Sequence, residues 1–70
     1  MLNGSKIREL RFSKGMTCND VSNLSKKLNV QVSKTYLEEL ERGDKVNPSF
    51  NIIEAIATIL CVKIDELRAS

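Results

Sequence analysis

The chain has 70 residues, of which 41% are hydrophobic and 29% charged, with a formal net charge of +2 at pH 7. This composition is typical of one folded domain and excludes a disordered tail, and no apolar run is long enough to span a membrane. Without a signal peptide, we expect a cytoplasmic protein with no membrane partner and a single domain over residues 1–70. The charge permits nucleic-acid binding without indicating it, but residues 1–47 hold nine basic and six acidic side chains, so an anion-facing surface is expected there.

The cysteines and the lack of histidine argue against catalysis. Cys18 and Cys61 do not have the spacing of metal ligands. They are either a redox switch or an intermolecular disulfide, or two semi-buried free thiols. Histidine, the commonest general base, is absent, and there is no nucleophile motif or phosphate loop. We therefore expect no enzyme, no catalytic residue, no metal, no cofactor and no small-molecule ligand.

The first predicted helix covers residues 5–14. Ile7 and Leu10 form its inner face at helical spacing, and Gly15 follows it as a left-handed cap. Phe12 lies off that face, and the pattern does not explain it.

The second predicted helix covers residues 17–29. Thr17 stands at its N-cap with Asp20 three residues later, close to a capping box, and Asn29 is placed to stop it. An apolar stripe follows at Val21, Leu24 and Leu28. Residues 30–32 then form an extended connector or a strand, although no second strand is available to pair with them.

The third predicted helix covers residues 33–42, between a Ser33 cap and Gly43. Its inner residues are Tyr36, Leu37 and Leu40. The fourth covers residues 49–60, after an Asn-Pro turn, and a short fifth covers residues 64–68. The inner face of the fourth helix consists of Phe50, Ile53, Ile56, Ala57 and Leu60. The expected fold class is all-α, with five short helices around one core.

The fourth helix carries a second apolar patch, formed by Ile52, Ala55 and Ile59. A single domain needs to bury only one face of this helix, so the patch predicts a homodimer interface made by the fourth and fifth helices. The alternative is that the fifth helix or the N-terminus of the same chain covers it.

Four short motifs together carry a resemblance to a known family. They are "IRELRFSKG" at residues 7–15, "LERG" at 40–43, "NPSF" at 47–50 and "IDEL" at 64–67. The chain resembles the Xre family, the Cro and phage-repressor type of helix-turn-helix DNA-binding domain, over nearly its whole length. The resemblance implies a compact five-helix lambda-repressor-like domain whose third helix lies in the major groove, and dimers that read two half-sites about one helical turn apart.

One departure from the family lies between Gly15 and Glu41, where this chain is several residues longer. The usual glycine of the turn is absent, and Asn29 or Gln31 falls near its place. We interpret the extra length as an elongated second helix followed by a longer connector. The angle between the second and third helices, and with it the half-site geometry, therefore stays open.

The resemblance also implies which side chains read bases. Lys34 and Thr35, in the first turn of the third helix, would reach guanine and a base edge or thymine methyl, beside the Ser33 cap. Glu39, one turn on, matches a base-contacting position and would accept from a cytosine amino group. For each of these side chains except the cap, the alternative is a solvated helix surface, and Glu38 has the same ambiguity.

Phosphate contacts are expected at the start of the second helix, through free amides and a hydroxyl, and after the third helix. The expected residues are Thr17, Cys18, Asn19, Arg42, Lys45 and Asn47. Lys26 and Lys27 either add two contacts or are solvated.

Glu41 matches the family position whose carboxylate pairs with an arginine of the first helix, here Arg11. Such a pair would connect the third helix to the first, and its contribution to stability depends on whether it is buried or exposed.

These residues predict a sequence-specific transcriptional regulator whose partners are double-stranded DNA and a second copy of itself, most simply a small dimeric repressor reading a pseudo-palindromic operator. The runner-up is a protein-binding helical module, such as an antitoxin or anti-regulator, which the low net charge and the acidic third helix favour.

Overall fold

The computed structural model describes residues 2–45 and 47–68. The described residues form four α-helices and one 3₁₀ helix: α1 (Gly4–Ser13), α2 (Cys18–Lys27), α3 (Lys34–Arg42), α4 (Phe50–Leu60) and η1 (Ile64–Leu67). The all-α class is confirmed, and no strand occurs in these ranges. The fifth α-helix was a wrong prediction, because its four residues lie between extended residues and make only one 3₁₀ turn. No helix in the described ranges has the length and apolarity that crossing a membrane requires.

α2, α3 and α4 begin at the predicted capping residues, whereas the cap of α1, Asn3, was not predicted. The side-chain oxygens of Thr17, Ser33 and Ser49 accept the backbone N–H three residues on, at 3.1, 3.0 and 3.4 Å. Asp20 completes the capping box by accepting the Thr17 N–H at 3.0 Å. Gly15 has a φ of 67°, which fits the left-handed cap expected of it. The chemistry of single side chains therefore fixes most helix starts.

The segment between α2 and α3 is held by a buried serine. α2 ends at Lys27, two residues earlier than predicted, and Asn29 turns the chain with a φ of 59°. The Ser25 hydroxyl is fully buried; it donates to the Ser22 carbonyl at 2.7 Å and accepts the Val32 N–H at 3.3 Å. Ser25 thus fixes the connector to α2, in front of the start of α3.

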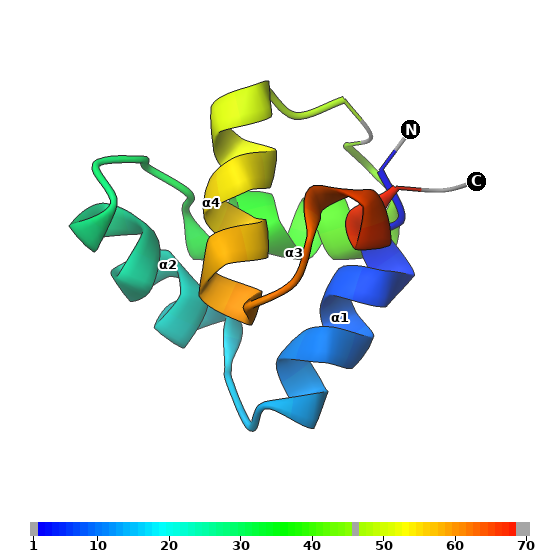
Figure 1. Ribbon diagram of the computed structural model, residues 1–70, viewed down its shortest axis with the longest axis horizontal. Helices are drawn as coiled ribbons and strands as arrows, with labels where there is room; N and C mark the ends of the chain where they lie inside the picture. The colour runs from blue at the N-terminus through cyan, green and yellow to red at the C-terminus, as the bar shows by residue number, and fades with distance from the viewer. Residues whose placement is uncertain (1, 46, 69–70) are drawn as a thin grey trace.

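The core lies where all five elements meet. α3 packs against both α1 and α2, while α4 packs against α2 and η1 (Figure 1). The Asn3 N–H donates to the Leu67 carbonyl at 2.7 Å, which joins the start of the described chain to η1. The large side chains that are almost fully buried are Ile7, Val21, Val32, Leu37, Leu40, Ile56, Leu60 and Leu67.

Two expectations about α4 are corrected. Phe50 was expected on the inner face but is 59% exposed. Its angle around the axis is within about 20° of the buried Ala57, so its exposure comes from its place in the first turn, two turns from Ala57 along the helix. Ala55 was expected on an open patch but is buried within the chain, where it lines a hollow with Leu28 and Val30 of the connector. The other patch residues, Ile52 and Ile59, are partly buried against the core.

Gly4 gives a test of how closely α1 approaches α3. A Cβ at Gly4 would collide with the Leu40 carbonyl oxygen and lie 3.0 Å from that of Glu41. We expect Gly4→Ala to destabilise the fold by about 1–3 kcal/mol in urea denaturation, because the backbone must shift. Helix propensity alone predicts the opposite, a gain of about 1 kcal/mol. The exposed Ser5→Ala is the control, and a Gly4→Ala variant at least as stable as wild type would contradict the close contact.

Candidate nucleic-acid interface

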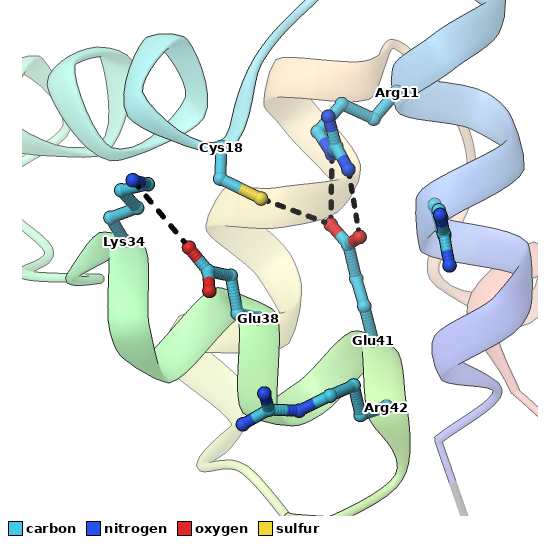
Figure 2. Close-up of a pocket in the computed structure, with 7 residues that line it drawn as sticks. Arg11, Cys18, Lys34, Glu38, Glu41 and Arg42 are labelled. Carbon is cyan, nitrogen blue, oxygen red and sulfur yellow. Dashed lines mark hydrogen bonds and ion pairs between the residues drawn. The ribbon is translucent and has the colours of Figure 1, made fainter.

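A hollow of about 350 Å³ opens among α1, the start of α2 and the length of α3 (Figure 2). Four of its lining side chains are basic, two are acidic and one is a thiol. They are Arg8, Arg11, Cys18, Lys34, Glu38, Glu41 and Arg42. The hollow is therefore a mainly cationic surface built by three helices.

The floor of the hollow is a two-pronged ion pair between α1 and α3. Arg11 donates from Nε and Nη2 to the two carboxylate oxygens of Glu41, both at 2.9 Å. Its remaining Nη1 donates to the Met16 carbonyl at 3.0 Å, in the turn before α2. The side chains are only 9% and 6% exposed, and the bond to Glu41 raises the Arg11 pKa. The pair expected from the sequence is present, and it is buried.

Cys18, the first residue of α2, lies against this pair. Its buried Sγ is 3.6 Å from Glu41 Oε2, so the thiol can donate a weak hydrogen bond to the carboxylate (Figure 2). Burial, together with the Glu41 charge, raises the Cys18 pKa above its ordinary value. The thiol is consequently kept protonated, which makes it a poor nucleophile. Cys61 is exposed and also free.

The outward face of α3 does not pack against the core. Leu37 and Leu40 are buried on the opposite side. Thr35 and Arg42, both exposed, lie about 20° apart around the helix axis and form the middle of the outward face. Glu38 and Glu39 lie on either side of them, and both are half-buried.

In a comparison with protein-family models, residues 4–70 match the family described as "Helix-turn-helix domain". The chain belongs to this helix-turn-helix family. The comparison with curated proteins found no match, and neither did the comparison with solved structures. Domains of the helix-turn-helix kind bind double-stranded DNA, with the second helix of the motif in the major groove. In this chain α2 and α3 are the two consecutive helices that the connector joins.

The expected base-reading residues of the helix-turn-helix lie along the start and outward face of α3. Ser33 is occupied as the helix cap, and its hydroxyl oxygen accepts the Tyr36 N–H. Lys34 and Thr35 are exposed. Lys34 Nζ lies 3.8 Å from a carboxylate oxygen of Glu38, one turn on, in an exposed ion pair (Figure 2).

The expected phosphate-contacting residues fall into two groups. At the start of α2, Cys18 turns its thiol inward, so its backbone N–H is the part left for an anion, beside the exposed Thr17 and Asn19. After α3, Arg42 pairs with Asp44 at 3.2 Å, which gives this turn acid a role as ion-pair partner. The remaining expected residues, which are all exposed, are Lys45, Asn47, Lys26 and Lys27.

Arg8 is the residue of the hollow that the sequence reasoning missed. Its guanidinium lies 5.3 Å from the centre of the Phe12 ring, and that of Arg11 lies 4.6 Å from the same ring. The exposed Phe12 therefore holds two arginines by cation–π contact, which accounts for an aromatic residue off the inner face of α1. The i, i+4 spacing of Arg8 and Phe12 was the available signal.

Removal of the Glu41 charge tests the buried pair. We expect Glu41→Gln to destabilise the domain by about 3–5 kcal/mol, because Arg11 would stay buried without its counter-charge. Asp44→Asn, which breaks an exposed pair with Arg42, is the control and should cost at most about 1 kcal/mol. Urea denaturation followed by circular dichroism measures both values, and equal small losses would contradict a structural role for Glu41.

The pH dependence of stability tests the environment of Cys18. Because folding raises the Cys18 pKa, the stability that the protonated thiol supports is complete below the unfolded-state pKa of about 8.5 and is lost as pH rises through the folded-state pKa. We expect wild type to lose more stability than Cys18→Ala between about pH 8 and 10. Parallel slopes for wild type and Cys18→Ala would contradict the raised pKa.

Proposed function

We propose that this helix-turn-helix chain is a transcriptional regulator of the Xre type, which binds double-stranded DNA sequence-specifically and acts as a small dimeric repressor. In this proposal α3 enters the major groove with Lys34 and Thr35 at base edges. Glu39 adds a further base contact one turn along the helix. The start of α2 and the segment after α3 bind phosphates.

The observation that carries the proposal is the outward face of α3. Thr35 and Arg42 occupy its middle without contributing to the core, and Lys34 stands at the end of α3 that follows the connector. Arg8 of α1 lines the same hollow as Lys34 and Arg42. Cations that flank a free helical face are suited to a groove whose edges carry phosphates.

The dimer is supported by the way such motifs read DNA, because two-fold proteins read two-fold operators. Ala55 cannot contribute, since the chain itself buries it, so the contacts expected from α4 reduce to the partly buried Ile52 and Ile59.

A protein-binding module is the second candidate, and Glu38 and Glu39 on the outward face of α3 favour it. A basic partner surface would suit these carboxylates, whereas DNA would bind them only at particular bases. The two candidates differ in whether purified protein alone shifts duplex DNA.

A band-shift on duplexes selected from a randomised library tests the DNA-binding proposal. We expect a pseudo-palindrome bound by two chains, with log affinity falling against log salt by about 0.9 per phosphate contacted. Lys34→Ala should weaken the selected site about tenfold and random DNA little, whereas Arg42→Ala should weaken both and lower the salt slope by about one contact.

Lys63→Ala, which removes an exposed lysine beside η1, is the matched control and should leave the selected site bound as by wild type. Failure to enrich any duplex, or binding with a flat salt response, would overturn the regulator in favour of the protein-binding module. Binding of one chain to a single half-site would contradict the dimer but not the DNA-binding function.

A further inference from the structure

We propose that Glu38 is a specificity-determining residue, which weakens the attraction of the cationic hollow for backbone phosphates and so penalises binding to DNA of the wrong sequence. The inference rests on the proposed DNA-binding function and adds a role for a carboxylate that family resemblance left unassigned. It depends on where Glu38 lies relative to the cations.

Glu38 is the more accessible of the two acids that line the hollow. The other lining acid, Glu41, is buried and fully engaged by Arg11. The Glu38 side chain is 42% exposed and lies 3.8 Å from Lys34 Nζ. Arg8 and Arg42 line the same hollow from α1 and from the end of α3. Arg42 is already paired with Asp44 at 3.2 Å, so Glu38 shares the hollow with two cations, Lys34 and Arg8, that neither the Arg11–Glu41 pair nor Asp44 neutralises.

The charge balance of the hollow then depends on one carboxylate. With Glu38 ionised, the hollow attracts an anion less strongly, and Lys34 already has a partner. A phosphate that enters must displace the carboxylate from Lys34 or lie beside it, and both cost free energy. On the preferred DNA sequence, Lys34 gains a hydrogen-bond acceptor on a base and the Glu38 carboxylate can face a base amino group, so this cost is offset there.

Glu38→Gln keeps the shape of the side chain and removes its charge. We expect this variant to bind a random-sequence 30-bp duplex about tenfold more tightly than wild type does, with a salt slope steeper by about one phosphate contact. Affinity for the duplex selected with wild type should change much less, so the ratio of the two affinities falls by about tenfold. Fluorescence anisotropy over a salt series measures both duplexes.

Glu54→Gln is the matched control, because it makes the same change in net charge from an exposed position on α4 that does not line this hollow. It should leave the ratio of specific to random affinity at the wild-type value. A thermal denaturation of both variants checks that neither is unfolded, and the exposed Lys34–Glu38 pair predicts a midpoint within a few degrees of wild type.

Three results would overturn the inference. If Glu38→Gln changes the two affinities in the same way as Glu54→Gln does, the effect is one of net charge. If Glu38→Gln weakens binding to both duplexes equally, Glu38 supports the helix and does not discriminate between DNA sequences. In both cases wild type still binds its selected duplex, so the proposed function stands. If wild type binds neither duplex, the proposed function fails and the role of Glu38 fails with it.

Discussion

The arrangement of the first three helices depends on the guanidinium of Arg11. All three of its nitrogens donate: two to Glu41 on α3 and one to the Met16 carbonyl before α2. A planar fork is suited to this because its donors point in fixed directions, which a lysine could not reproduce. Since both charges are buried, the pair contributes geometry more than net stability. α3 is thereby held with its apolar side on the core and the opposite side outward.

The link between α2 and α3 is fixed by a second set of contacts. Asn29 adopts the left-handed conformation that a glycine would otherwise supply, as asparagine does more readily than most residues. Ser25 then satisfies a buried backbone N–H of the connector, and Val32 joins the core. The N–H groups of Asn29, Val30 and Val32 thus have partners, which fixes the link although it contains no helix of its own.

Sequence reasoning succeeded where a feature depends on neighbouring residues. The caps at Thr17, Ser33 and Ser49 and the left-handed Gly15 are local chemistry, and they placed the helices to within two residues. It failed where the outcome depends on what lies across the fold. Whether Phe50 or Ala55 is buried is decided by neighbouring elements and the connector. The need for a glycine at position 4 is visible only in the folded structure, where the carbonyls of α3 leave no room for a Cβ. The site divides in the same way: the Arg11–Glu41 pair followed from family motifs, whereas Arg8 joins the hollow through tertiary packing.

The acidic residues of α3 are compatible with a polyanionic partner, because the carboxylates differ in their environments and roles. Glu41 is neutralised inside the protein, and Asp44 is held by Arg42 beyond the end of the helix. Only Glu38 and Glu39 remain near the outward face, on either side of Thr35 and Arg42. In the proposed complex with DNA, two carboxylates there would lower the general, sequence-independent attraction to phosphates and leave the base contacts a larger share of the binding free energy. For a domain with a net charge of only +2, discrimination would then come from weak non-specific binding as much as from strong specific binding.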